Sequence, residues 1–241
     1  MPKLAYLLYR NPDLSYDEFV RHYSGVHSPL SVEAMPLQTF YVANLADETD
    51  ALRATTAGSS PEPPPVDAIA FLRFDDISVL ADPTRLYATR EMEERLTADG
   101  AYLFAAMHGY VVDETVRWDT GRTWPLGQPS PGVNEISLVR KALDVDRAEF
   151  RRHLEDADGL LAPGRHSGVC RSVQNFVIDA VTPDAAPLDA LVEAQFRTED
   201  DFRDHQRLDA ARSSAVSPDV GRFVDQSTTV SIVARETVWI G

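Results

Sequence analysis

Apolar residues recur with two different periods along this chain, and each period predicts a different element. The segments 4–8, 66–76 and 105–118 are short apolar stretches, partly alternating, which is typical of strands. After the first of them, apolar residues three or four positions apart form one stripe of an amphipathic helix: Phe19, Tyr23, Val26 and Leu30. The chain is therefore expected to begin with a strand and a helix, and further strands follow.

The first helix recurs later in the chain, which indicates an internal duplication. Residues 18–22 (EFVRH) match residues 149–153 (EFRRH), and this offset of 131 positions holds without a gap from residue 4 to residue 45. Both helices also begin with a capping box, in which two residues three positions apart bond each other's backbone amides: Ser15 with Glu18, and Asp146 with Glu149.

The later strands of the two copies match as well, at an offset of 122 positions. Residues 66–76 resemble residues 188–198, and residues 113–118 resemble residues 235–240. The difference between the two offsets falls in residues 48–66, whose Pro, Ser and Gly content predicts an exposed loop.

Each copy therefore has the order β-α-β-β-α-β, which is the ferredoxin-like unit. A four-stranded antiparallel sheet with both helices on one face leaves its other face bare, so each unit needs a partner sheet. We expect an α+β protein in which the antiparallel sheets of two ferredoxin-like repeats face each other as a pseudo-dimeric α+β barrel. The predicted division is 1–118 for the first repeat, 119–132 for a linker and 133–241 for the second repeat.

Alternate residues of a strand face opposite sides, so the set that stays apolar in both copies is expected to lie under the helices. In the first strand this set is Ala5 and Leu7, matched by Ile136 and Leu138, and in the third strand it is the alternate residues of 68–74. The opposite set would line the space between the sheets, and its mixed character is typical of a small-molecule pocket: Leu4, Tyr6, Leu8, Ile69, Phe71, Arg73, Glu135, Ser137, Val139, Leu191, Glu193 and Gln195.

The charge of the chain excludes several classes of partner. Its 38 acidic and 23 basic residues give a formal net charge of −15, which would repel nucleic acid and anionic membranes. The single cysteine, Cys170, cannot form an internal disulfide, and the first residues carry no apolar run long enough for a signal peptide or a membrane span. We expect a cytoplasmic protein. A monomer is expected because the two copies satisfy each other's sheets, and a homodimer through the outer helices is the alternative.

The sequence carries none of the common cofactor motifs. HExxH, GxGxxG, Walker and GxSxG patterns are missing, and one cysteine cannot make a thiolate cluster. His22 and His27 are five positions apart, a spacing that does not place two ligands on one face of an α-helix. The sequence therefore predicts no metal site and no cofactor.

The segment 14–30 (LSYDEFVRHYSGVHSPL), with residues 40–44 (FYVAN) after it, resembles the EthD family within the dimeric α+β barrel superfamily. The resemblance rests on a helix that opens with an acidic residue and Phe and closes as aromatic-x-x-x-His-x-Pro. It implies a pocket for hydrophobic, often aromatic compounds. The superfamily includes polyketide cyclases, anthrone-type monooxygenases, muconolactone isomerases and haem-handling proteins, so the fold alone does not give the reaction.

The two copies do not match this family pattern equally. The resemblance covers residues 3–118 well and residues 133–240 more loosely. In the second copy Asp158 stands at the position of His27, so a family role for this histidine applies only to the first half.

His27 is the leading candidate for chemistry, because an imidazole can act as a general acid or base near neutral pH. It lies near the predicted C-terminal end of its helix, where the helix dipole favours a protonated ring. The alternative is that it caps the helix and packs against Pro29. Tyr6 would orient an oxygenated ring, and Arg73 would stabilise an enolate or carboxylate. The expected substrate contacts are Tyr41, Phe71, Glu135 and Glu193.

Three functions are consistent with these residues. The first is a cofactor-independent enzyme that acts on a hydrophobic aromatic or polyketide-like small molecule by acid/base chemistry, through cyclisation, dehydration, isomerisation or oxygenation. The second is a non-catalytic small-molecule or haem-binding barrel, with His27 or His108 over an apolar cavity. The third is a structural domain whose interior is filled by side chains. A sizeable cavity that touches His27 would count against the third.

Overall fold

A computed structural model describes residues 3–47, 66–157, 168–212 and 220–241 of the chain. In the first half, strands and helices alternate as follows: β1 (Lys3–Arg10), α1 (Tyr16–His22), the π turn η1 (Tyr23–His27), α2 (Ser28–Ala34), β2 (Gln38–Ala46), β3 (Ala68–Phe74), the 3₁₀ turn η2 (Ile77–Ala81), α4 (Pro83–Leu86), α5 (Arg90–Leu103) and β4 (Phe104–Asp119). The second half repeats the order: β5 (Asn134–Val139), α6 (Arg147–Ala157), β6 (Val169–Ala180), β7 (Ala190–Phe196), α7 (Glu199–Arg212), α8 (Val220–Phe223) and β8 (Val230–Ile240).

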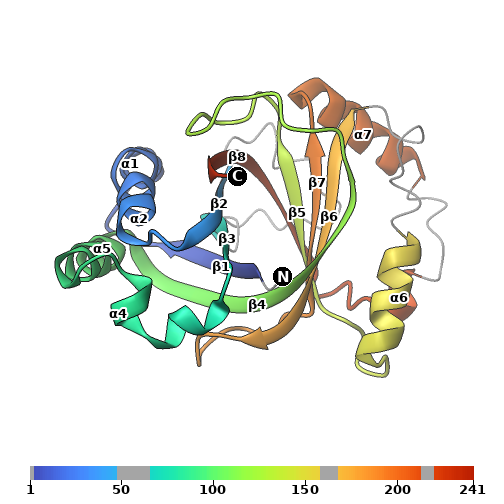
Figure 1. Ribbon diagram of the computed structural model, residues 1–241. Coiled ribbons are helices and arrows are strands. Elements are labelled where there is room, and N and C mark those ends of the chain that lie inside the picture. Colours follow the sequence, from blue (N-terminus) through green and yellow to red (C-terminus); the bar gives the residue numbers. More distant parts are fainter. Residues whose placement is uncertain (1–2, 48–65, 158–167, 213–219) are drawn as a thin grey trace.

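The eight strands close into one antiparallel barrel in the order β1-β3-β2-β8-β5-β7-β6-β4. Each half supplies one four-stranded sheet, and the sheets join where β2 pairs with β8 and where β4 pairs with β6. The helices of the first half cover one outer side of the barrel and those of the second half cover the opposite side (Figure 1). The predicted fold, two ferredoxin-like repeats facing each other as an α+β barrel, is confirmed.

Two predictions about segments outside the barrel have different outcomes. The Pro-rich segment 48–65 lies outside the described residues. Residues 120–133, between β4 and β5, form neither a helix nor a long strand, and Ser130 within them donates its backbone amide to the Glu236 carbonyl of β8. The division of the chain into 1–118 and 133–241 stays a prediction.

The strand registers decide which residues face the inside of the barrel. Leu4 lies opposite Leu72 and Ala5 lies opposite Phe71, and directly opposed residues share a face. The predicted faces of β3 are therefore confirmed, with Phe71 inside, but those of β1 are reversed. Ala5 and Leu7 face the interior, and Leu4, Tyr6 and Leu8 lie under the helices.

The same correction applies to β5. Glu135 lies opposite Ala194 on the outer face, and its carboxylate is 3.4 Å from the Gln206 amide of α7. For β1 the physical reason is that the strand is buried on both faces, so both of its alternate sets are apolar, and β5 was assigned by its match to β1. Such a strand carries no alternation from which its faces can be predicted.

A buried ionic network occupies part of the barrel interior. The ammonium of Lys3, which has no exposed surface, lies 2.5 Å from Glu114 and 3.6 Å from Glu193 and stacks 4.0 Å above the centre of the Phe71 ring. Arg73 also pairs with Glu114, at 2.6 Å. The pKa of Glu114, which burial would raise, is held below its usual value by Lys3 and Arg73.

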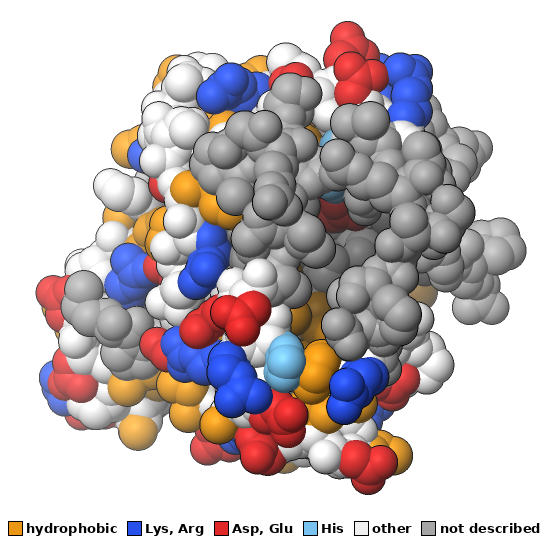
Figure 2. All heavy atoms as spheres, turned by 90° about the vertical axis from the view of Figure 1, so that its right-hand side faces the viewer, with side chains coloured by type: hydrophobic (Ala, Val, Ile, Leu, Met, Phe, Trp, Pro, Cys, Tyr) orange, Lys and Arg blue, Asp and Glu red, His pale blue; other side chains and the backbone are white. Residues whose placement is uncertain are grey.

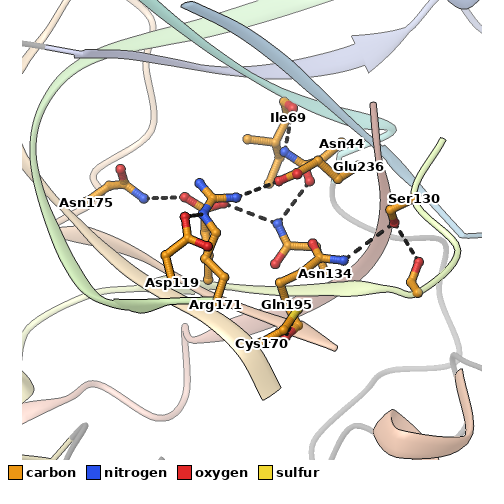
Figure 3. A network of polar contacts seen from close by, with 12 residues as sticks. Asn44, Ile69, Asp119, Ser130, Asn134, Cys170, Arg171, Asn175, Gln195 and Glu236 are labelled. Atoms are coloured by element: carbon orange, nitrogen blue, oxygen red, sulfur yellow. Dashed lines mark hydrogen bonds and ion pairs between the residues drawn. The ribbon is translucent and has the colours of Figure 1, made fainter. Parts of the chain in front are cut away.

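Side chains of the second half complete this network (Figure 3). Arg171 pairs with Glu236 at 2.7 Å, although burial raises the pKa of that carboxyl. Asn134 donates to Asn44 of the first half at 3.0 Å, so polar contacts cross between the halves. Three cations therefore face three carboxylates in a space that also holds the buried amides of Asn44, Asn134 and Asn175. The apolar side chains that share this space include Ala5, Leu7, Ile69, Tyr110, Ile136, Leu138, Leu191 and Ile232.

No helix among the described residues is both long and apolar enough to span a bilayer. On the described part of the face that carries α6 and α7, acidic and basic side chains lie intermingled (Figure 2). That part of the surface therefore presents no field of a single sign.

The network gives a prediction about stability. Replacing Lys3 by Met should cost about 3–5 kcal/mol of unfolding free energy, because Glu114 and Glu193 lose the buried cation that they share. Urea denaturation measures this loss. The control is Arg90→Met, which removes an exposed ion pair with Glu94 and should change stability by less than about 0.5 kcal/mol. Equal effects of the two substitutions would show that the network does not hold the halves together.

Candidate active site between the first sheet and its helices

A cavity of about 550 Å³ lies between the outer face of the first sheet and the helices that cover it. Its floor comes from β1 and β3, and its walls come from η1, α2, α4 and α5. The lining is mainly apolar and, among the described residues, contains no Lys, Arg, Asp or Glu. The polar groups that reach it come from Tyr6, Tyr23, His27, Ser31, Tyr41, Tyr87 and Thr97.

The π turn η1 brings two histidines of one helix to the same side. In this turn the Ser28 amide bonds to the Tyr23 carbonyl five residues earlier, so one turn takes up an extra residue. His22 and His27, five positions apart, therefore lie about one turn apart on one side. The sequence argument that this spacing separates them assumed a regular α-helix and is wrong.

The π turn also changes the electrostatic setting of His27. The helix continues from α1 through η1 into α2. Pro29 lies in the first turn of α2, and because proline has no N–H group, the π turn leaves no amide unbonded at this position. His27 thus lies in the middle of a continuous helical segment. The predicted effect of a helix C-terminus on its ring does not apply.

Asp99 of α5 accepts a hydrogen bond from each of these histidines. Its two carboxylate oxygens lie 2.6 Å from His22 Nε2 and 2.7 Å from His27 Nδ1. Burial would raise the pKa of Asp99, but the hydrogen bonds and charges of His27 and His22 hold it below its usual value. Because Nδ1 of His27 donates to Asp99, Nε2 of the neutral ring carries the lone pair.

Aromatic rings fix the orientation of His27 at the edge of the cavity. Its ring centre lies 5.2 Å from that of Tyr23 and 5.2 Å from that of Phe104, with the Phe104 ring nearly perpendicular. The histidine side chain is only 13% exposed. A ring held by a carboxylate on one nitrogen and by two aromatic neighbours is pre-organised for proton transfer at the other nitrogen.

A cluster of neutral hydroxyl groups forms another part of the wall. The Tyr41 hydroxyl lies 3.1 Å from that of Tyr23 and 3.0 Å from that of Ser28. Burial raises the pKa of Tyr23 and of Tyr41, although in Tyr41 the hydrogen bonds oppose it. Both phenols therefore stay protonated at neutral pH, and each carries one O–H proton, of which their mutual hydrogen bond uses one.

The side chain of Tyr6 lies over a glycine of the neighbouring strand and reaches the same cavity. It lies opposite Gly109 of β4, where an added Cβ would come within 2.7 Å of the Tyr6 ring. The glycine is required because the ring lies over its backbone. Burial, and then the nearby Tyr87, raise the pKa of Tyr6, so this phenol is also a donor.

The structure brings together some of the predicted site residues and separates others. His27, Tyr6 and Tyr41 line one cavity. Arg73, Phe71 and Glu193 lie in the barrel interior instead, where Arg73 contacts Glu114 and Glu193 contacts Lys3. Glu135 lies on the outer face of the second half.

Sequence reasoning missed Asp99 and Tyr23. Asp99 lies 72 positions from His27, and nothing in its local pattern distinguishes it from the other acidic residues of α5. Tyr23 was counted as part of the apolar stripe, although its position four residues before His27 could have indicated a shared wall.

His153, the counterpart of His22, stacks on Phe223 with ring centres 3.3 Å apart.

Comparison with known proteins places the chain among relatives of the same fold. A sequence profile of the EthD domain matches residues 11–106 and 142–227, which is more than half of the chain. No curated protein sequence matches it.

Solved structures resemble the whole chain. An anthrone oxidase-like protein is 10% identical with a TM-score of 0.58, and the match covers 99% of this chain and 92% of that one. A candidate monooxygenase from Lactobacillus acidophilus is 10% identical with a TM-score of 0.52, covering 99% and 96%. One from Fusobacterium nucleatum is 9% identical with a TM-score of 0.53, covering 99% and 92%. At these identities the likeness establishes the fold.

The shared carboxylate gives a prediction about pH. Replacing Asp99 by Asn should cost about 1–3 kcal/mol of unfolding free energy at pH 7, because an amide oxygen cannot serve both histidines. The folded-state pKa of Asp99 is lowered, so its contribution is present above the unfolded value of about 3.9 and is lost as the pH falls through the folded value. The stability difference between wild type and variant should therefore shrink below about pH 4.

Chemical denaturation from pH 3 to pH 8 measures this difference. The matched control is Asp200→Asn on α7, where the carboxylate is 89% exposed and pairs only with Arg203 among the contacts described. Its effect should be small at every pH. A pH-independent loss in Asp99→Asn would contradict the lowered pKa.

Proposed function

The chain belongs to the EthD domain family, and from the cavity in its first half we propose that it is an enzyme that removes a proton from an uncharged aromatic or polyketide-like small molecule. The observation that carries this proposal is the Asp99–His27 pair at the edge of an apolar cavity. His27 acts as the general base, and Asp99 positions it. The cavity also argues against a purely structural domain, because it is sizeable and touches His27.

The role of each group follows from its surroundings. Asp99 holds His27 in the tautomer that presents Nε2, and it stabilises the imidazolium that forms when the ring accepts a proton. This arrangement contributes to catalysis by proton transfer, for which positioned side chains typically supply 10²–10⁴-fold, as an order of magnitude. Arg73, which lies in the barrel interior, is not part of this proposal.

The lining supports an uncharged substrate. A carboxylate or phosphate buried there would lack a Lys or Arg partner among the described lining residues, and burying an unpaired charge is costly. The volume of about 550 Å³ lies within the range of pockets for drug-sized ligands. Tyr6 and the Tyr23–Tyr41 pair supply neutral donors for a carbonyl or hydroxyl oxygen of the substrate.

The proposed first step moves one proton from the substrate to His27. An acidic C–H or O–H next to an aromatic or carbonyl group loses its proton to His27 Nε2, and the electron pair stays on the substrate as an enolate or phenolate. The tyrosine hydroxyls donate hydrogen bonds to the developing oxyanion. Return of the proton to another atom gives isomerisation, loss of hydroxide gives dehydration, attack on a second carbonyl gives cyclisation, and reaction with dioxygen gives oxygenation.

A haem-binding protein is the second candidate. An imidazole that donates its other nitrogen to a carboxylate is also the arrangement of many metal-bound histidines, and His27 has it. The neutral lining favours the enzyme over this alternative, because the haem propionates would find no cationic partner among the described lining residues. We propose that the chain needs no organic cofactor, and haemin titration tests this directly. A Soret shift in wild type that is lost in His27→Ala would favour haem.

The closed barrel supports a monomeric enzyme. Each barrel strand in the described part of the chain is paired on both sides within one chain, so this barrel leaves no sheet edge for a second copy.

Deuterium exchange into anthrone, an uncharged three-ring ketone with an acidic methylene, tests the proposed proton transfer. Wild-type protein in D₂O should accelerate this exchange, measured by mass spectrometry at short times. His27→Ala should lower the protein-dependent rate by about 10²–10⁴-fold, and Asp99→Asn should lower it less, because the base remains. His153→Ala, the matching histidine of the second half, is the control and should leave the rate unchanged.

Two results would contradict the proposal. One is protein-dependent exchange that persists in His27→Ala. The other is equal loss of exchange in His27→Ala and His153→Ala, which would indicate a general loss of structure. Far-UV circular dichroism of each variant separates such a loss from a missing base.

A further inference from the structure

Gly100 lies next to Asp99 in α5 and lines the cavity beside His27. Backbone conformation or close contacts require glycine at some positions of the described chain, although Gly25, like Gly100, has neither. Gly168 has a φ of +107°, and a Cβ on Gly132 would come within 1.9 Å of the Phe196 carbonyl oxygen. Glycine is required at both positions.

No such reason applies to Gly100. Its φ does not lie in the left-handed region, and a Cβ built on it would meet only Phe104, at an ordinary contact distance of 3.9 Å. Alanine would therefore fit its backbone and its neighbours. Glycine within a helix also lowers the folding equilibrium constant about fivefold relative to alanine. Helix propensity and the space around position 100 therefore favour alanine over the glycine that is present.

The face that α5 turns to the cavity is built mainly from small residues. Together with the larger Leu96, α5 contributes Thr97, Gly100 and Ala101 to the lining. These three small residues leave space on this part of α5, on the side of the cavity that His27 also lines.

We propose that Gly100 is a specificity-determining residue, which keeps the cavity deep enough for a fused-ring substrate beside His27. This inference rests on the proposed function, since it concerns the substrate of the same site. A side chain at position 100 would project into the cavity near the base. It would exclude large ring systems first, and a single ring would still fit.

Two substitutions at this position test the inference. Gly100→Ala should raise Tm by about 2–4 °C, because the helix gains propensity without a clash. Gly100→Leu should fill the cavity, so its affinity for anthrone should fall at least about tenfold, while its affinity for phenol should change less than twofold. Isothermal titration calorimetry with phenol, 1-naphthol and anthrone measures the three affinities in each protein.

Matched controls use Ala98, an exposed residue of α5 that is not part of the cavity lining. Ala98→Gly should lower Tm by about as much as Gly100→Ala raises it. Ala98→Leu adds the same bulk to the same helix and should leave all three affinities unchanged.

The outcomes separate this inference from the proposed function. Unchanged anthrone affinity in Gly100→Leu overturns the inference, and so does a lower Tm in Gly100→Ala, which would make the glycine structural. In either case, His27-dependent exchange in wild type would leave the proposed function standing. Failure of wild type to bind any of the three compounds would overturn both. Selective loss of anthrone, with a raised Tm for the alanine variant, supports the inference.

Discussion

Closure of the barrel within one chain is the constraint on which the rest of the structure depends. Two sheets that each bury one face against the other leave no free edge, and they force the inner side chains to fill a fixed space. That space contains three cations, three carboxylates and a set of apolar residues, all supplied by both halves. Removal of one partner would leave an unpaired buried charge, so the network must stay complete, and its contacts hold the two halves together. The cavity described above lies instead on the outer face of the first sheet, under the helices.

The site depends on a departure from regular helix geometry. A π turn holds one more residue per turn than an α-helix, and here that extra residue brings His22 and His27 to the same carboxylate. Pro29 suits this turn because it cannot donate the amide bond that a regular helix would use. The η1 segment thus loses regular α-helical hydrogen bonding, and in return the positions of His22 and His27 are fixed by one carboxylate. His27 gains a defined tautomer and a defined direction, which are the two properties that a general base requires.

Much of the fold could be predicted from the sequence, because the duplication gives two sequences for each element, and a pattern kept in both is a stronger signal. Matched capping boxes placed both first helices, and β3 showed its faces through alternation that was kept in both copies. β1 did not, because a strand buried on both faces is apolar throughout. The sequence therefore placed Tyr6 in the space between the sheets, whereas Tyr6 and Tyr41 line the cavity under the helices. Asp99 could not be found, since its role is set by a contact between two helices that no local period records.

The asymmetry between the halves follows from the same physics. In the barrel each half needs the other for its inner face, but each outer face can be packed independently. In the second half, Phe202 of α7 packs against Phe196 of the sheet, and His153 of α6 stacks on Phe223. The first half leaves space under α5 and has a glycine within this helix, and both features lower stability locally. A duplicated fold can therefore carry a costly site in one half, because the other half and the shared interior supply the stability that the site gives up.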